Sequence, residues 1–308
     1  MTGTDTYSST DLQYSIPEIW GPKVNELFKA KLGAANFFTD LSADMPEGDT
    51  LNIPGIYSNV FEAKDKSNGD EVTLQSPAQT NNQLSVDTWK EVSYLIEDKE
   101  LKQMKGSLNL QGRYAKQAAY TIKKALDTSL MSLYSGLSQT VNDTANNVDD
   151  VSIREALEEL EANDIPREDR MFFFHPTVYW HDIMGITKYY DASQAGWNNE
   201  KGPIISGNFG SKLSSGNGIR GMLYGVPVMT TTQVQADGAD TAYFNMLAHK
   251  DAFVFAVQTP GGNRVRVQTD YQVPNLGMLW VNDIIYGVKE NRDDAAVVIE
   301  SQQSGVVS

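Results

Sequence analysis

The chain has 308 residues and a mass of 34.1 kDa, and its 25 basic against 40 acidic residues give a formal net charge of −15. Its 40% hydrophobic content suffices for one large or two modest folded domains, and a surface this acidic argues against general binding to nucleic acid. Because cysteine is absent, disulfides, thiolate metal sites and cysteine nucleophiles are excluded.

The first 45 residues have the character of an extended arm. Residues 1–12 are polar and lack the basic and apolar regions of a secretory signal, so we expect a soluble protein of the cytoplasm. The longest apolar runs have strand length, far short of the roughly 18 residues that a membrane span requires. Six apolar residues predict a short helix that lies on another surface: Ile16, Ile19, Trp20, Val24, Leu27 and Phe28.

From Leu51 to Val92 the pattern indicates strands. Asn68-Gly69 lies between Val60–Lys66 and Glu71–Leu74, and this dipeptide favours a hairpin turn because both residues accept a positive φ. The flanking residues are mostly charged, so the predicted hairpin has little apolar core of its own. We therefore expect another surface to order it.

The strongest predicted helix covers residues 108–134. At 1.5 Å per residue it is roughly 40 Å long, whereas a compact chain of this length has a radius of gyration of about 19 Å. An elongated subunit follows, with a break in the helical pattern near Gly106. The apolar face of this helix is formed by Leu108, Ala115, Ala119, Ile122, Leu126, Leu130 and Leu133.

The second half of the chain alternates shorter elements. Ser152-x-x-Glu155 predicts a capping box that starts a helix at Ser152, with an apolar stripe of Ile153, Ala156, Leu157 and Leu160. Residues 191–220 are rich in glycine and serine and predict a long loop. The other predicted elements are a strand at Met171–Phe174, a helix at Pro176–Met184, and strands at Tyr224–Thr231, Ala242–Ala248, Phe253–Gln258, Val265–Tyr271, Leu279–Val288 and Ala295–Glu300.

Motifs of catalysis and metal binding give no positive signal. The glycines of 216–221 match G-x-G-x-x-G, but the flanks predict neither the strand nor the helix that a dinucleotide site needs. His175 and His181 are six residues apart and cannot share a helix face. The Asp- and Asn-rich segment 142–150 lacks the EF-hand spacing, which favours a solvated loop over a cation site. We expect no enzyme activity, no cofactor and no metal.

The charge is distributed unevenly. Residues 143–169 include ten acidic and two basic residues, a net of −8, whereas residues 99–124 have a net of +6. Two interpretations remain for the basic set: a solvated or salt-bridged helix face, or a surface turned toward a polyanion or an acidic patch of another subunit. At 100° per residue, one stripe of about 120° would contain Lys99, Lys102, Lys105, Arg113, Lys116, Lys123 and Lys124.

The order of these elements resembles the major capsid proteins of tailed double-stranded DNA bacteriophages, which have the Hong Kong 97 fold. The likeness covers nearly the whole chain, and G-x-x-x-G-V-P-V and Ile-Ile-Tyr-Gly-Val-Lys are its most specific parts. The stretches that carry it are IPEIWGPKVNELF, LSVDTWKEVSYLIED, LNLQGRYAKQAAYTIKKALDTSLMSLY, REALEELEANDIPREDRMFFFHPTVYWHDIM, IRGMLYGVPVMTT, FNMLAHKDAFVFAVQ and MLWVNDIIYGVKENRDDAAVVIE.

The resemblance implies an α+β capsid subunit with five segments. Residues 1–45 would be an N-terminal arm and 46–96 an E-loop hairpin that reaches over a neighbour. Residues 97–149 would form a peripheral domain with the spine helix, 150–280 an axial domain, and 281–308 strands that return to the peripheral domain. The coreless hairpin, the long helix and the apolar arm are all features that neighbouring subunits would cover in a closed shell.

The implied function is structural: self-assembly of hexamers and pentamers into an icosahedral phage head that encloses double-stranded DNA. Because the arm begins almost at Met1, the resemblance implies that scaffolding is a separate protein or a segment that has been cleaved off. The other implied partners are a portal protein and a decoration protein. DNA contact would be non-specific, no membrane would be involved, and the virion would assemble in the host cytoplasm. The alternatives are an encapsulin-like nanocompartment shell and, more distantly, an acidic cytosolic enzyme or ligand-binding protein.

Overall fold

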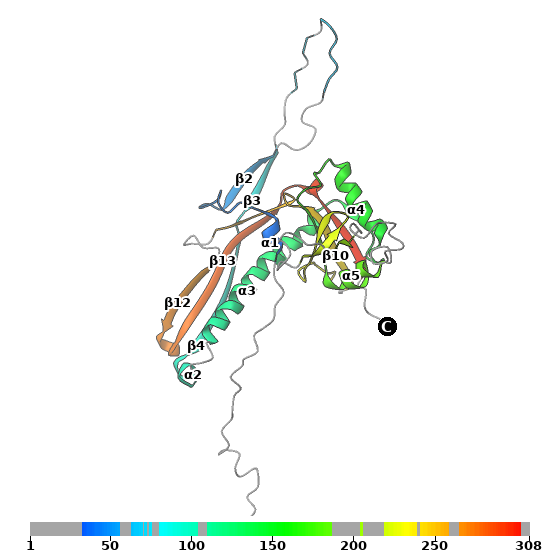
Figure 1. Cartoon of the computed structure of the whole chain (residues 1–308). Helices are drawn as coiled ribbons and strands as arrows, with labels where there is room; N and C mark the ends of the chain where they lie inside the picture. The colour runs from blue at the N-terminus through cyan, green and yellow to red at the C-terminus, as the bar shows by residue number, and fades with distance from the viewer. Residues whose placement is uncertain are drawn as a thin grey trace, which may run out of the picture.

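The computed structural model describes residues 33–55, 63–69, 71–72, 74–75, 80–103, 110–186, 204–205, 219–238, 241–258 and 265–302. The helix predicted within residues 16–28 and the break predicted near Gly106 lie outside these ranges. The described chain is a mixed α+β fold of two sheets joined end to end, with a long helix along one of them (Figure 1). The predicted fold class and the elongated shape are confirmed.

A five-stranded sheet forms the long half of the molecule. Its central strand, β13 (Gly277–Glu290), pairs along one edge with β4 (Thr88–Glu97). The other edge of β13 pairs first with β12 (Arg266–Gln272) and then with β11 (Phe253–Val257). The short strand β1 (Thr39–Asp40) adds parallel to β11. The predicted C-terminal strands are therefore present, and β13 is the longest of them.

The predicted long helix is confirmed as α3 (Leu110–Met131), which is followed by a 3₁₀ turn, η1 (Ser132–Gly136). Its 22 residues extend roughly 33 Å, so the helix is shorter than expected. It packs on β13 and β4 through residues spaced four apart, which is the helical period of a single buried face. This buried row consists of Ala118, Ile122, Leu126 and Leu130. A short helix, α2 (Asp98–Gln103), precedes it.

The seven-stranded sheet has the order β5-β14-β10-β6-β9-β8-β7. All five residues of its strand β6 are buried, which explains the phenylalanine-rich sequence there. Helices α4 (Asp150–Ala162) and α5 (Pro176–His181) lie at this end, with α4 against β14 and β5. The strands are β5 (Thr140–Val141), β6 (Arg170–Phe174), β7 (Ile204–Ile205), β8 (Ile219–Leu223), β9 (Val226–Thr230), β10 (Ala242–His249) and β14 (Ala296–Gln302).

The predicted capping box at Ser152 is wrong. Helix α4 begins at Asp150, and its N-cap is Asp149, whose carboxylate accepts the backbone N–H of Ser152 at 2.8 Å and the Ser152 hydroxyl at 2.7 Å. A carboxylate at the N-cap satisfies a free N–H and faces the positive end of the helix dipole, so Asp149 competes well with a serine as cap. The predicted apolar stripe is otherwise confirmed, since Ile153, Ala156 and Leu160 are buried.

The predicted hairpin is paired at its base and not at its tip. Strands β2 (Thr50–Gly55) and β3 (Thr80–Ser85) are antiparallel, and Asn68-Gly69 forms a turn with a φ of +97° at Gly69. In the described part of residues 63–75 there is no strand, so the strands predicted beside this turn are not found there. The base packs on the five-stranded sheet, because Leu84 of β3 is buried in an apolar cluster with Val254 and Ala256 of β11. A two-stranded ribbon without such an apolar face is only marginally stable.

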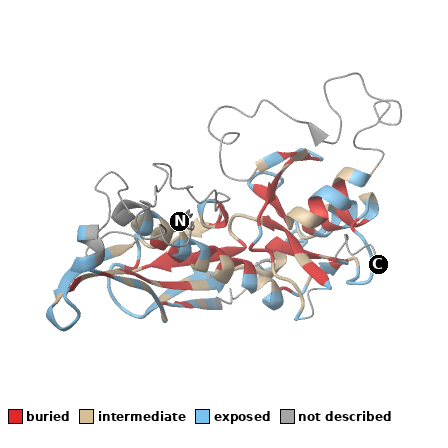
Figure 2. Cartoon of the chain, turned by 90° about the horizontal axis from the view of Figure 1, so that it is seen from below, coloured by how far each residue is buried: buried red, intermediate tan, exposed pale blue. Residues whose placement is uncertain are grey.

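One apolar core connects the two sheets. Phe172, Phe173 and Phe174 of β6 belong to the same buried cluster as Phe253 and Phe255 of β11. Figure 2 shows buried residues concentrated where the sheets meet, with exposed residues toward the far end of the five-stranded sheet. The two halves therefore share a core, and neither sheet is packed independently of the other.

Strand pairing cuts across the expected segments at several places. β11 and β12, expected in the segment 150–280, lie in the five-stranded sheet, and β5, expected in the segment 97–149, lies in the seven-stranded sheet. β4 was expected in the hairpin segment 46–96, but it pairs along its length with β13. The segment 281–308 was expected to return as a whole to the spine-helix sheet. It divides, because β13 lies in that sheet while β14 pairs with β10 in the seven-stranded sheet. When two paired strands are far apart in sequence, their pairing depends on tertiary contacts, which local sequence patterns do not reveal.

Candidate interaction surfaces

The histidines singled out from the sequence have structural roles. His175 is the N-cap of α5, and its Nδ1 accepts the backbone N–H of Thr177 at 3.3 Å. Its ring stacks on Tyr243 with centroids 3.9 Å apart, and burial lowers the pKa of His175. His181 is the last residue of the same helix. No group of three or more His, Asp or Glu side chains suited to a metal occurs in the ranges that the structure describes.

The other candidate loops are also structural. Gly221 lies in strand β8, so within the described residues the G-x-G-x-x-G match is not followed by a helix that could receive a phosphate. In the Asn-rich segment, the Asn142 amide donates to the carbonyl oxygen of Glu300 at 2.8 Å and fixes the turn before α4. Among the described helices none is both long and apolar enough to cross a membrane.

The predicted basic stripe divides between two helices. Lys105 lies outside the described residues, as does the side chain of Arg113, whose backbone is in α3. None of the other stripe residues makes an ion pair with a described carboxylate, so salt bridges within the described part of the chain do not account for them. These exposed residues are Lys99 and Lys102 on α2, and Lys116, Lys123 and Lys124 on α3.

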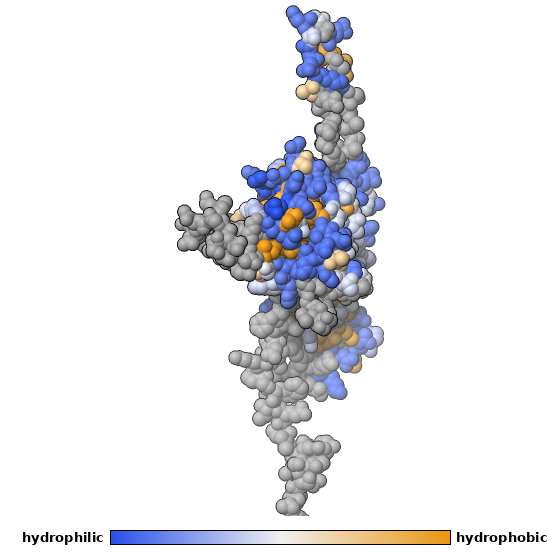
Figure 3. All heavy atoms as spheres, turned by 90° about the vertical axis from the view of Figure 1, so that its right-hand side faces the viewer, coloured by the Kyte–Doolittle hydropathy of each residue, from blue (hydrophilic) through white to orange (hydrophobic). Residues whose placement is uncertain are grey.

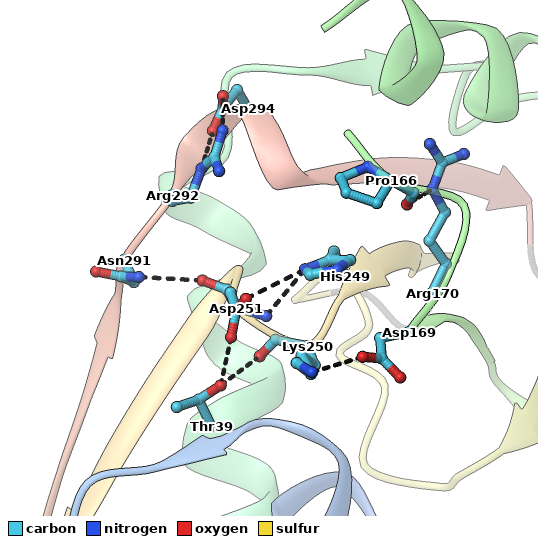
Figure 4. Close-up of polar contacts among 10 residues, drawn as sticks. All are labelled: Thr39, Pro166, Asp169, Arg170, His249, Lys250, Asp251, Asn291, Arg292 and Asp294. Atoms are coloured by element: carbon cyan, nitrogen blue, oxygen red, sulfur yellow. Dashed lines mark hydrogen bonds and ion pairs between the residues drawn. The ribbon is translucent and has the colours of Figure 1, made fainter. Parts of the chain in front are cut away.

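A polar junction holds the two sheets at the turn between β10 and β11 (Figure 4). The Asp251 carboxylate accepts the hydroxyl of Thr39 at 2.7 Å, and its backbone carbonyl accepts the Asn291 amide at 3.2 Å. Lys250 pairs with Asp169 at 2.5 Å, and this hydrogen bond lowers the pKa of the Asp169 carboxyl. Four segments from distant parts of the sequence therefore meet at one turn. Their hydrogen bonds fix the relative orientation of the two sheets.

The start of the described chain is anchored on α3. The carboxylate of Asp127, a buried residue, accepts the backbone N–H of Ala35 at 3.1 Å, in the short helix α1 (Ala34–Phe37). Burial raises the pKa of Asp127, although hydrogen bonds from the backbone of residues 33–35 oppose the shift. The arm therefore leaves the body of the molecule next to the α3 face that carries the lysines.

An ion pair lies on the face of the five-stranded sheet away from α3. The Arg266 guanidinium donates to both carboxylate oxygens of Asp283, at 2.9 and 2.6 Å, and the indole N–H of Trp89 donates to the same carboxylate at 3.0 Å. These three residues come from β12, β13 and β4, so the cluster ties together the strands of the sheet. The hydrogen bond from Arg266 is the main reason that the pKa of Asp283 is lowered.

Because its folded pKa is lowered, Asp283 stabilises the fold above its unfolded pKa of about 3.9, and this contribution is lost as the pH falls through the folded value. We expect Asp283→Asn to reduce the free energy of unfolding by about 1–2 kcal/mol at pH 7 and by much less at pH 3. Denaturant unfolding at both pH values measures this. The control is Asp270→Asn, an exposed carboxylate of β12, and a pH-independent loss at Asp283 would contradict the assignment.

Exposed apolar side chains mark three further places. In the described part of the hairpin loop, Val72 is 71% and Leu74 is 91% exposed. Val273 and Leu276 are exposed at the turn between β12 and β13, and Val151 is exposed on α4. A single exposed apolar residue is ordinary, but apolar residues at the extremities of an elongated subunit are typical of surfaces that other chains cover.

Comparison with solved structures assigns the fold. A structure of Mycobacterium phage Che8 has a TM-score of 0.72 and 18% identity, over 92% of this chain and 96% of that chain. The capsid structure of the cyanophage P-SCSP1u has a TM-score of 0.70 and 13% identity, over 98% and 97% of the two chains. This chain has a phage capsid fold. The bacteriophage PhiM1 mature capsid also matches, with a TM-score of 0.70 and 15% identity over 98% and 96%.

The likeness is in three dimensions and extends over almost the full length of both chains. No family model and no curated protein matches the sequence. At these identities the side chains that contact neighbours are not carried over from one capsid fold to another. The surface residues must therefore be interpreted from their own exposure, charge and partners.

Proposed function

We propose that this chain is the major capsid protein of a tailed double-stranded DNA phage and assembles into the icosahedral shell of its head. The observation that carries the proposal is the match to phage capsid structures over more than nine-tenths of both chains. The isolated subunit adds physical support, because its hairpin and the turn after β12 expose apolar residues that a shell would cover. Its role is structural, without catalysis or a cofactor.

We assign the segments on the same basis. Residues 1–45 are the N-terminal arm, and 46–96 contain the E-loop hairpin, whose paired base is β2 and β3. The spine helix α3 and the five-stranded sheet form the peripheral domain. The axial domain is the seven-stranded sheet with α4 and α5. Strand pairing supports placing β4 with the peripheral domain and β14 with the axial domain.

The partners follow from the proposed role. Copies of this chain form hexamers and pentamers, a scaffolding protein and a portal protein act during assembly in the host cytoplasm, and a decoration protein binds the outside of the shell. Packaged DNA is contacted without sequence specificity. The net charge of −15 is consistent with a shell that does not bind the DNA tightly. The exposed lysines of α2 and α3 serve contacts between subunits.

The test is assembly of the full chain, expressed alone and together with the scaffolding protein encoded near it. We expect closed shells in electron micrographs and a megadalton species in analytical ultracentrifugation. A stable monomer that never assembles under either condition would refute the proposal. Shells that copurify with a specific cargo enzyme and lack portal and scaffolding partners would instead identify an encapsulin-like nanocompartment.

A further inference from the structure

One face of α3 carries three exposed lysines. Lys116, Lys123 and Lys124 are exposed, and none makes an ion pair in the part of the chain that the structure describes. At 100° per residue they fall within an arc of about 100°, beside the buried row that faces the sheet, and the same arc contains the buried residues Asp127 and Met131. The three lysines are called here the basic face.

One face of α4 has the opposite charge. Glu155, Glu158 and Glu159 are exposed and make no ion pair with a described residue, unlike Asp150 and Glu161, which pair with arginines. They too fall within an arc of about 100°. Val151, 46% exposed, lies on the same side of the helix and adds an apolar contact. These four residues are called here the acidic face.

The acidic face lies at one end of the molecule. Figure 3 looks onto that end and shows a small apolar patch surrounded by hydrophilic surface. Figure 1 places α4 at the end formed by the seven-stranded sheet, while the lysine-bearing part of α3 lies along the five-stranded sheet. In the described chain no ion pair joins the two faces, which lie on helices packed against different sheets.

We propose that the basic face of α3 docks against the acidic face of α4 in a neighbouring copy of the chain. The inference rests on the proposed shell function and names a pair of surfaces within it. Each copy has one face of each sign, so the contact is head-to-tail, and repeated contacts close into rings when the rotation between copies allows it. In an assembly of identical copies, the basic faces and the acidic faces are therefore equal in number.

The charge balance favours a second copy over a polyanion as the partner of the lysines. The net charge of −15 repels DNA, RNA and a second copy alike at long range, so the local charges that each partner would neutralise decide between them. A polyanion would leave the acidic face of α4 unpaired. Complementary faces on neighbouring copies neutralise both, and such complementarity mainly selects the correct partner and orientation.

Charge reversal tests the contact. We expect Lys116→Glu with Lys123→Glu to lower the assembled fraction about tenfold or more, because like charges would then face each other. Glu155→Lys with Glu158→Lys should have the same effect, and the chain with all four changes should assemble again. The matched control, Lys90→Glu with Lys289→Glu, makes the same change of charge on strands β4 and β13, at residues that belong to neither face, and should assemble normally. Circular dichroism of each soluble chain verifies folding.

Cross-linking locates the contact directly. Shells assembled from equal amounts of unlabelled and nitrogen-15-labelled chain are treated with a carbodiimide, which joins a lysine to an adjacent carboxylate. We expect peptides that link the basic face to the acidic face and combine both isotopes. The proposed contact would be overturned if every cross-link between the two faces joined peptides of the same isotope. It would also be overturned if shells contained no such cross-link and the charge-reversal variants assembled normally.

The remaining outcomes separate this inference from the proposed function. If the lysine reversal changes only the amount of copurified nucleic acid and the glutamate reversal has no effect, the basic face binds a polyanion and the docking is refuted. In that case the shell function stands. If the unaltered chain never forms shells, the proposed function fails, and the docking fails with it.

Discussion

Replacing Gly287 with alanine is expected to reduce the free energy of unfolding by about 3 kcal/mol or more. A Cβ atom at this position of β13 would lie 2.0 Å from the carbonyl oxygen of Ser85 and 3.0 Å from the Cα of Val86. Both are backbone atoms, so no change of side-chain rotamer relieves the overlap. The last residue of β3 and the residue that follows it must shift, and the base of the hairpin moves away from the sheet.

Denaturant unfolding of the soluble chain measures the loss, and amide hydrogen exchange of residues 80–97 shows where it occurs. Gly185→Ala is the matched control, because a Cβ there meets no atom within 4 Å and the backbone does not have a positive φ. The control should change stability by less than about 0.5 kcal/mol. Similar stability of both variants and the unaltered chain would show that β13 and residues 85–86 are not in close contact.

The hairpin base shows what the sequence could and could not predict. Strands with continuous apolar runs, such as Phe253–Val257, were recognisable because burial on both faces leaves a local pattern. The contact between Gly287 and Ser85 joins residues about two hundred positions apart. A glycine inside a strand can signal a close backbone approach, but only the folded structure shows which backbone approaches.

The same distinction applies to the interaction surfaces. The lysines of α3 were recognisable on one face from helical spacing alone, since that geometry is local. The cluster of Trp89, Arg266 and Asp283 was missed, because it depends on the register of three strands. The polar junction at Asp251 was missed for the same reason. Helix faces are thus predictable from a single sequence, whereas contacts across strands are not.

Phe38 links the arm to the common core, and Phe38→Ala is expected to cost about 3–5 kcal/mol. The side chain is 4% exposed, and its ring lies 5.4 Å from Phe173 and 5.0 Å from Phe253, measured between centroids. These partners belong to different sheets, so Phe38 fills the seam between them. Truncation leaves a cavity there and also removes the apolar anchor that holds the arm beside Asp127.

Phe37→Ala is the matched control, because its half-buried ring contacts Phe173 only edge-on, with centroids 5.5 Å apart, and should cost about 1–2 kcal/mol. Hydrogen exchange at residues 33–40 should rise strongly in Phe38→Ala, since the Asp127 hydrogen bond alone is worth only about 1–2 kcal/mol. Phe38→Leu should recover most of the stability, because it refills much of the cavity. If Phe37→Ala and Phe38→Ala reduced the free energy of unfolding equally, the arm would be held by contacts spread along it and not mainly by Phe38 between the two sheets.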